Sequence, residues 1–485
     1  MKIIRSFLIT VVIFFQFVVC QNSIQKEIDS FSNIEALKNA SISFLAIDLE
    51  ASHTIAELHP KTTLPSASTA KLFSTSTALK ILGPDFHPST TIYFEGKISQ
   101  DSILEGNIWV KGGGDPTLGS TYFNEKGDES YFLEVWVNEI KQYGIKQING
   151  CVIVDGSDYS YLGVPDGWTW ADMGNYYGAG PSGIVLYDNM LKYHFQTGTI
   201  GEITTLTSTF PIVEKLNFDN QIISSSKRGD NSYIYGAPYS LQRFGIGELP
   251  SNRKDFMVKG SIPDPEIQLA IELTNKLEIE GIKVEKGAKS FRLNQKSFAN
   301  DYANFTRLLS YPGKTISDIV TLTNQKSINL FAEQLLFLFS KKDENIGSTN
   351  EGLKMIENCW GNEVDFSSMY LTDGSGLSRS NAISASHFCQ LLSSIYQSNI
   401  FTDFENSLPI AGCSGTLKNV CKNQLGHGRI KAKSGTLTRV KSYAGYVDSK
   451  SGKKIAFAII VNNYNCSSYQ LVKHLEKMFN KLVEY

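Results

Sequence analysis

The sequence has little of what marks disulfide-rich, nucleic-acid-binding or metal-dependent proteins. Seven cysteines in 485 residues are too few for a disulfide scaffold. Lysine and arginine number 46 against 48 acidic residues, and no basic run typical of nucleic-acid binding occurs. The spacings CxxC and HExxH are absent, and the seven histidines are scattered. We therefore expect no nucleic-acid partner, no metal and no cofactor.

The composition that remains is that of a globular chain. Hydrophobic residues make up 41% and charged residues 19% of the sequence, which is enough apolar material to bury a sizeable core. A length of 485 residues predicts two or three domains.

The pattern of the N-terminus predicts an export signal rather than a part of the folded domain. Lys2 and Arg5 precede an apolar run over residues 6–19, which is shorter than the roughly 20 residues needed to span a bilayer. We expect residues 1–20 to be a cleaved signal peptide and the protein to be periplasmic or otherwise exported. An alternative is lipidation at Cys20, and only in that case do we expect membrane association.

Six cysteines follow the expected signal peptide. Export permits disulfides, and Cys413 and Cys421 are the only close pair, so a bridge between them is one prediction. The alternative is six free thiols, and the sequence does not decide between them.

The pattern of apolar residues predicts a mixture of helices and strands. Residues 90–300 alternate short strands with turns, and residues 302–338 have helical periodicity. We expect strands at 41–47, 106–112, 151–155, 429–440, 440–447 and 454–462, and helices at 64–83, 131–143, 328–339 and 467–485.

A serine and a lysine lie three residues apart where the first of these helices begins. On a helix, Ser68 and Lys71 face the same way. A serine hydroxyl needs a base to act as a nucleophile, and a lysine can serve where its neutral form is populated. The same spacing occurs at residues 224–227 and 451–454, but in polar, turn-like surroundings. We therefore favour Ser68 as nucleophile and Lys71 as base.

Two further motifs carry complementary chemistry. Ser327 and Asn329 precede a buried helix and offer a hydroxyl for proton relay and an amide for a substrate carbonyl. Lys433 and Ser434 lie in an alternating strand, where a cation and a hydroxyl can hold a carboxylate, and Gly435 allows a ligand backbone to approach. Helix SxxK, helix SxN and strand KSG, in this order, are the signature of serine acyl-enzymes that react with penicillin.

The chain resembles the penicillin-binding protein 4 type D-alanyl-D-alanine carboxypeptidases, peptidase family S13. The matching motifs run in family order over nearly all of the chain after residue 20. They are residues 65–71 (PSASTAK), 112–118 (GGGDPTL), 168–177 (WTWADMGNYY), 373–379 (DGSGLSR), 415–417 (GTL) and 432–437 (AKSGTL).

The resemblance implies an α/β fold in which a transpeptidase-like domain is split by a large insertion. Ser327 lies 259 positions after Ser68, whereas Lys433 follows Ser327 by only 106. We expect the transpeptidase-like domain at residues 21–85 and 300–485, and inserted material of mainly β or mixed structure at 86–299.

The resemblance also implies a reaction. Ser68 would form an acyl-enzyme with a D-Ala-D-Ala peptide, Lys71 would be the base, and Ser327 would relay the proton to the leaving D-alanine. Lys433 and Ser434 would hold the terminal carboxylate. Peptidoglycan stem peptides would be substrates, cut by carboxypeptidase or endopeptidase action, and β-lactams would be covalent inhibitors.

Four further residues receive binding roles from the same resemblance. Asn329 would bind the substrate amide, and the backbone N–H groups of Ser68 and Thr436 would form the oxyanion hole. Asp172 stands where related enzymes place an acid that reads the free amine of the diamino acid, and Arg379 is a candidate carboxylate partner. The neighbouring Trp168, Trp170 and Tyr177 are equally well explained as core aromatics.

Two other functions use the same residues. A serine β-lactamase would share Ser68 and Lys71, but the Glu-x-x-Leu-Asn segment that class A enzymes use for deacylation is absent. A non-catalytic module that binds β-lactams or peptidoglycan would keep the fold and lose the base or the relay, yet Lys71 and Ser327 are both retained. Ser434 replaces the common threonine and keeps its hydroxyl. Ser414 stands where the family often has aspartate, and nothing in the sequence explains that change.

Overall fold

The computed structural model describes residues 23–124, 127–341 and 345–485, and these fall into two compact units. The first unit takes in the chain up to residue 84 together with 320–328 and 353–485, and the second takes in 85–319 and 329–352. The expected signal peptide and Cys20 lie outside the described residues. Among the helices that are described, none is long and apolar enough to cross a membrane.

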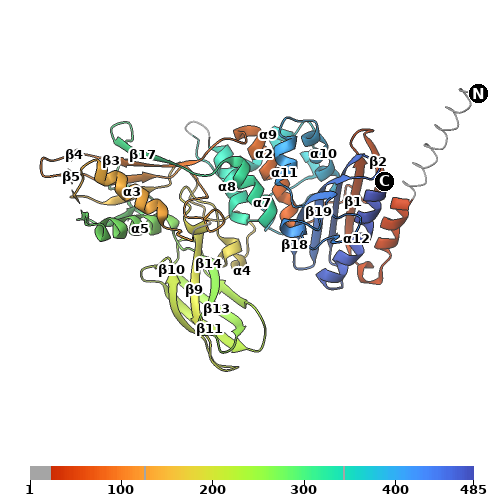
Figure 1. Cartoon of the computed structure of the whole chain (residues 1–485), viewed down its shortest axis with the longest axis horizontal. Helices are drawn as coiled ribbons and strands as arrows, with labels where there is room; N and C mark the ends of the chain where they lie inside the picture. The colour runs from red at the N-terminus through yellow and green to blue at the C-terminus, as the bar shows by residue number, and fades with distance from the viewer. Residues whose placement is uncertain (1–22, 125–126, 342–344) are drawn as a thin grey trace, which may run out of the picture. The chain divides into compact units, whose positions relative to one another are not determined.

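The first unit is built on one antiparallel sheet that joins the two ends of the chain (Figure 1). Its strand order is β18-β19-β20-β1-β2, so β1, near the start of the chain, pairs along its whole length with β20, near the end. The strands are β1 (Ser41–Asp48), β2 (His53–Leu58), β18 (Ile430–Leu437), β19 (Val440–Asp448) and β20 (Lys454–Asn462).

Helices cover both faces of this sheet. Phe479 of α12 (Ser468–Glu484) packs edge-on against Tyr443 and Phe457, which places α12 on one face. Tyr446 points to the other face and donates its hydroxyl to the carbonyl of Leu392 in α10 (Ala385–Tyr396). Both faces of the central strands are therefore buried, which explains why β20 reads as a nearly continuous apolar run.

Local sequence signals fix the ends of these helices. Ser467 caps α12 in a reciprocal box with Gln470. The helix after Ser68 consists of a 3₁₀ turn, η2 (Ala67–Ala70), followed by α2 (Lys71–Leu82), and Gly83 ends it with φ +84°. The remaining elements of, or bordering, this unit are η1 (Glu35–Leu37), α7 (Ile316–Lys326), α9 (Thr349–Trp360), η5 (Phe366–Ser368), α11 (Phe401–Ser407) and η6 (Gly415–Leu417).

The second unit contains four small sheets. Their strand orders are β16-β8-β6-β3-β17, β15-β7-β5-β4, β10-β9-β14 and β11-β13-β12. The strands are β3 (Ser89–Phe94), β4 (Lys97–Ile98), β5 (Ile103–Glu105), β6 (Ile108–Lys111), β7 (Gln147–Ile148), β8 (Val152–Asp155), β9 (Met190–Gln196), β10 (Thr205–Phe210), β11 (Asn217–Ser225), β12 (Asn231–Tyr235), β13 (Gln242–Pro250), β14 (Phe256–Ser261), β15 (Lys283–Val284), β16 (Ala288–Ser290) and β17 (Thr306–Pro312). The helices are α3 (Tyr131–Gln142), α4 (Trp170–Met173), η3 (Tyr176–Gly178), η4 (Tyr187–Asn189), α5 (Pro265–Ile279), α6 (Phe291–Asn294) and α8 (Asn329–Ser340).

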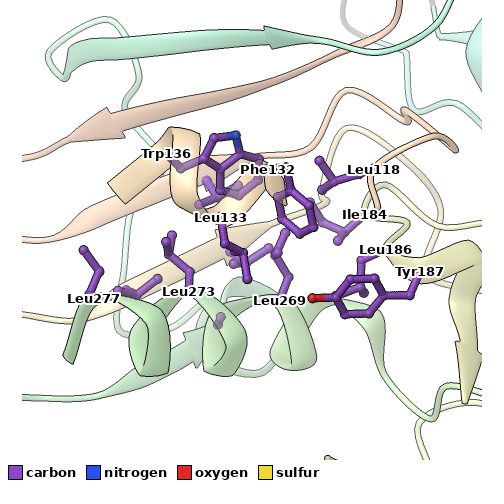
Figure 2. Close-up of a cluster of buried hydrophobic side chains, with 14 of the residues drawn as sticks. Leu118, Phe132, Leu133, Trp136, Ile184, Leu186, Tyr187, Leu269, Leu273 and Leu277 are labelled. Atoms are coloured by element: carbon purple, nitrogen blue, oxygen red, sulfur yellow. The ribbon is translucent and has the colours of Figure 1, made fainter. Parts of the chain in front are cut away.

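Two helices supply the centre of the second unit's core. Figure 2 shows Leu133 of α3 pointing toward Leu269 and Leu273 of α5, and all three are buried. Asp264 begins α5 by accepting the backbone N–H groups of its first turn, and a proline follows at the first helical position. Burying such a leucine stabilises the fold by roughly 1.5–3 kcal/mol.

Most expected elements form, with two exceptions. Residues 90–300 do not only alternate short strands with turns around one helix, because α5 (Pro265–Ile279) is a second long helix there. The expectation of helical structure throughout residues 302–338 is wrong at β17, which pairs antiparallel with β3. Residues 300–319, which contain β17, belong to the second compact unit. Residues 329–352 also belong to the second unit.

The bridge between Cys413 and Cys421 is not formed, and all six cysteines of the described residues are free thiols. Cys421 is buried in the core beneath α12, whereas Cys413 is exposed and its Sγ lies 3.5 Å from His427 Nε2. The two thiols therefore occupy different environments.

Candidate active site

Ser68 lies on a tight, internally bonded turn at the start of α2. Ala67, just before it, has φ +50°, a conformation that costs a non-glycine residue free energy and persists only where its surroundings hold it. The Ser66 carbonyl accepts the hydroxyls of Thr69 at 2.8 Å and Ser442 at 2.5 Å. Ser442 is on β19, so the turn that presents Ser68 is tied to the sheet.

Lys71 is fully buried and reaches Ser68. Its Nζ donates to Ser68 Oγ at 3.0 Å and to the carbonyl of Ser375 at 2.7 Å. The first contact is the pairing of amine and hydroxyl that the helical spacing predicts. It places a proton acceptor within reach of the hydroxyl that would have to lose its proton.

A second serine–lysine pair forms in the same unit, 106 residues apart in sequence. Lys433 Nζ on β18 donates to Ser327 Oγ at 2.9 Å and to the carbonyl of Ser434 at 2.9 Å. Ser327 has φ +60° in the break between α7 and α8. Burial, and then the positive charges of Lys71 and Lys441, lower the pKa of Lys433 well below its usual value.

The outer face of β18 carries two hydroxyls. Ser434 Oγ donates to Thr416 Oγ1 at 2.8 Å, and Thr436 Oγ1 accepts from Lys441 Nζ at 2.8 Å. Burial lowers the pKa of Lys441 to about 8. The hydroxyls of Ser434 and Thr436 thus lie near two lysines, Lys433 on the same strand and Lys441 on β19, an arrangement that suits a bound carboxylate.

Gly435 lets the strand lie against the nucleophile's turn. A Cβ atom at this position would lie 2.6 Å from the Ser66 carbonyl oxygen, 2.3 Å from Ser442 Oγ and 3.0 Å from Ser68 N. Any side chain here would push β18 away from Ser68. This close approach explains glycine at position 435 in local steric terms.

Asn329 and Asp172 belong to the second unit. Asn329 Nδ2 donates to the Tyr177 carbonyl at 2.8 Å, so the SxN asparagine anchors the segment that also carries Asp172. Asp172 Oδ2 accepts the backbone N–H and the hydroxyl of Thr169 and thereby caps α4. Both residues have local structural contacts in addition to the binding roles expected of them.

The aromatic residues of this segment divide between core and surface. Trp168 is buried, Tyr177 is half-buried, and Trp170 is 55% exposed with its ring against Tyr235. The interpretation as core aromatics thus fits Trp168 but not Trp170. In the first unit, the exposed Arg379 donates to the Thr438 carbonyl just beyond β18.

The structure therefore brings together most of the expected site residues in the first unit. The SxxK pair, Ser327, the KSGT strand segment and Arg379 lie there, whereas Asn329 and Asp172 do not. Three neighbours received no role from the sequence: the Ser375 carbonyl, Thr416 and Lys441. The motifs DGSGLSR and GTL pointed to the first two, and Lys441 follows from its register opposite Thr436. Among the described residues, no group of three or more metal-ligating side chains forms.

Comparison with known proteins extends this picture. The profile of the D-Ala-D-Ala carboxypeptidase 3 (S13) family matches residues 24–480. The chain belongs to this family. The S13 resemblance read from the motifs is confirmed, and with it the assignment of the chain to a family of serine peptidases.

Individual S13 relatives are distant but match over most of their length. The D-alanyl-D-alanine carboxypeptidase DacB of Haemophilus influenzae is 25% identical, over 96% of this chain and 97% of its own. A D-alanyl-D-alanine carboxypeptidase of Actinomadura is 24% identical, over 91% of this chain and 81% of its own.

Solved structures confirm the α/β fold expected from the sequence. The crystal structure of penicillin binding protein 4 from H. influenzae aligns with a TM-score of 0.77 and 22% identity, over 94% of this chain and 99% of that one. The same protein complexed with a β-lactam aligns with a TM-score of 0.74 and 21% identity, over 94% and 99%.

Proposed function

We propose that this protein is a serine-type D-Ala-D-Ala carboxypeptidase or endopeptidase that cleaves peptidoglycan stem peptides through an acyl-enzyme on Ser68. The observation that carries the proposal is the pair of serine–lysine contacts, Lys71 with Ser68 and Lys433 with Ser327. Further support comes from the S13 relatives, which are named D-alanyl-D-alanine carboxypeptidases.

In this proposal, acylation uses the contacts of these residues. Lys71 Nζ accepts the proton of Ser68 as Oγ attacks the carbonyl carbon between the two D-alanines. The N–H groups of Ser68 and Thr436 stabilise the oxyanion, and each such donor typically contributes a few kcal/mol. As the C–N bond breaks, Ser327 passes its proton to the leaving amine and is reprotonated from the lysines beside it. Water then attacks the acyl-enzyme and releases the shortened peptide.

Substrate recognition divides among the remaining residues. Lys433, with a positive charge, and Ser434 hold the terminal carboxylate, and Asn329 binds the amide of the acyl side. Asp172 binds the free ammonium group of the diamino acid side chain, and Arg379 pairs with a carboxylate. If Asp172 has this role, D172N will lower kcat/KM for a peptide with a free side-chain amine and leave its N-acetylated counterpart unaffected. Equal losses on both peptides contradict the role.

Export forms part of the same proposal. A wall substrate lies outside the cytoplasmic membrane, and Lys2, Arg5 and the apolar residues 6–19 are the features of a signal peptide. Intact mass of the protein purified from a producing cell tests this. A mature chain that begins after Cys20 supports cleavage, a diacylglyceryl mass on Cys20 supports lipidation, and an uncleaved chain contradicts both.

Intact mass after incubation with benzylpenicillin tests the catalytic proposal. We expect a stable adduct of one penicillin on the wild type and none on Ser68→Ala. Ser76→Ala is the matched control, because this buried serine lies on the same helix and donates only within it, to Leu72 and Phe73. Release of D-alanine from a stem pentapeptide, blocked by penicillin, completes the assignment.

Other outcomes favour the alternative functions. If no adduct accumulates but the drug is consumed in a Ser68-dependent way, the protein is a β-lactamase. If the drug survives and no adduct forms on folded protein, the protein is a non-catalytic module and the proposal fails.

A further inference from the structure

A loop 300 residues downstream of Lys71 supplies the acceptor for its amine. A neutral amine that takes the Ser68 proton must aim its lone pair at Oγ, so its N–H groups need acceptors elsewhere. The Ser375 carbonyl, 2.7 Å from Nζ, is such an acceptor, because a carbonyl can only accept. It therefore orients Lys71 before the reaction and still accepts from the ammonium afterwards.

The Ser375 carbonyl lies in a loop that is itself neither helix nor strand. The carboxylate of Asp373 accepts three N–H groups: Gly376 N at 2.8 Å, Ser378 N at 2.7 Å and Asn381 Nδ2 at 2.8 Å. Asp373 is 1% exposed. Three charge-assisted hydrogen bonds to one buried carboxylate fix the path of residues 373–378.

The loop of residues 373–378 contacts the chain on both sides of the SxxK motif. Ser74, one turn beyond Lys71 on α2, donates to the Gly374 carbonyl at 3.0 Å. Gly376 has φ +77°, and a Cβ atom there would lie 1.9 Å from the Ala67 carbonyl oxygen. The loop thus packs against the residue before the nucleophile and bonds to the helix that carries the base.

From these contacts we infer that Asp373 is a positioning residue, which holds the Ser375 carbonyl where it orients Lys71 toward Ser68. The inference rests on the proposed function, because it assigns Asp373 a part in acylation. Asp373 does not touch the reacting atoms and acts through the loop.

Asp373→Asn tests this inference with little change of side-chain size. The amide nitrogen replaces an oxygen and then faces a backbone N–H, so the loop loses part of its support. Asp48→Asn is the matched control: Asp48 is also 1% exposed in the first unit, and its Oδ1 accepts Glu50 N and Ala51 N in the turn after β1. Both variants are followed by thermal unfolding and by the rate of acylation with fluorescent penicillin from pH 5 to 10.

We expect D373N to acylate about 10²-fold more slowly at the plateau of the pH profile, the order of loss that a misplaced catalytic group causes. The acidic limb of the profile moves to lower pH, because the Lys71 ammonium loses an acceptor while the charge of Lys433 still opposes its own. D48N leaves both the plateau and the limb unchanged even where its unfolding temperature falls as far. A merely structural role for Asp373 would lower the unfolding temperature and leave the limb in place.

The inference is overturned if folded D373N acylates at the wild-type rate over the whole pH range. Should D373N fail to fold, Asn381→Ala removes one donor to Asp373 and keeps the carboxylate. We then expect acylation to slow by about tenfold with the same shift of the limb, and an unchanged profile again overturns the inference. The wild type separates the two proposals: failure of its own acylation counts against the proposed function, whereas normal wild-type acylation with unaffected variants counts against Asp373 alone.

Discussion

The buried lysines of the first unit and the buried carboxylates of the second unit lie in different surroundings. In the first unit the buried titratable groups include Lys71 and Lys433 beside carboxylates such as Asp48 and Asp373, and the amine of each lysine bonds to a serine hydroxyl. No acidic side chain of the described residues pairs with Lys433. In the second unit the buried groups include the carboxylates of Asp115 and Glu266, and their partners are backbone N–H groups and hydroxyls.

The comparison distinguishes a buried group that we propose acts on a ligand, Lys433, from buried carboxylates that hold the fold together, Asp115 and Glu266. Burial raises the pKa of Glu266 to about 7 and that of Asp115 to about 6, although hydrogen bonds oppose the shift. Glu266 accepts Ser290 Oγ, Arg292 N and Gly156 N, so it ties three segments together. Lys433 bonds to Ser327 and to the Ser434 carbonyl, and under the proposed function a substrate carboxylate would offset the cost of burying its charge.

The largest effect that tests this contrast is expected from Lys433→Met. Acylation by penicillin will fall by about 10²–10³-fold, as for loss of a single electrostatic donor in an active site. The unfolding temperature will not fall, because the change removes a buried cation without an acidic partner. Lys431→Met is the control: it lies two residues earlier on β18, pairs with Glu405 at 2.8 Å, and will lose stability but not acylation. If K433M acylates within about threefold of the wild-type rate, Lys433 does not act on the ligand and the distinction from Glu266 fails.

A smaller effect, on stability alone, is expected from Glu266→Gln. The folded protein holds a proton on Glu266 up to about pH 7, whereas the unfolded chain releases it near 4.5. The folded state therefore binds more protons between these values, and the wild type loses stability as pH rises from about 4.5 to 7. The contribution of this group is about 3 kcal/mol.

Urea unfolding of the wild type and E266Q at several pH values measures it. We expect a flatter pH dependence for E266Q and unchanged penicillin acylation. The exposed Glu280→Gln, which follows α5, should leave the slope between pH 4.5 and 7 as it is. An unchanged slope in E266Q, or loss of acylation, would show that Glu266 is not the purely structural group described here.

The smallest effect is expected from Lys441→Gln. Lys441 is half-buried and bonds to Thr436, so its removal should change acylation by about threefold or less. Its pKa of about 8 in the folded state lies below the usual 10.5, so the unfolded chain binds more protons between these values. The wild type therefore gains stability from about pH 8 to 10.5, and K441Q will not. A much larger loss of acylation would place Lys441 among the groups kept for the ligand.

The sequence predicted those parts of the fold and the site that depend on nearby residues. The helix beyond Ser68 and its end at Gly83, the three C-terminal strands and α12 follow from periodicity and capping. The contact of Lys71 with Ser68 follows from helical spacing. The contact of Lys433 with Ser327 was not predicted, although the order of the motifs assigned both residues to one site.

What the sequence did not predict depends on distant partners. Strand β17 has a pattern compatible with a helix, and its pairing with β3, more than 200 residues earlier, decides the outcome. The Ser375 acceptor is a backbone carbonyl, which no side-chain motif encodes. Cys413 and Cys421 are close in sequence, but the fold buries one and exposes the other.

The pairing of β1 with β20 has a consequence for how the protein is made. Three of the five strands in the catalytic unit's sheet lie after residue 429, so a ribosome or a translocation channel delivers them last. Ser68 emerges early in synthesis, but β18, the strand that lies against its turn, has not yet been made. We therefore expect a nascent or truncated chain without these strands to be inactive toward β-lactams. One edge of β1 pairs at once with β2, but its other edge has no partner until some 400 residues later, when β20 is made.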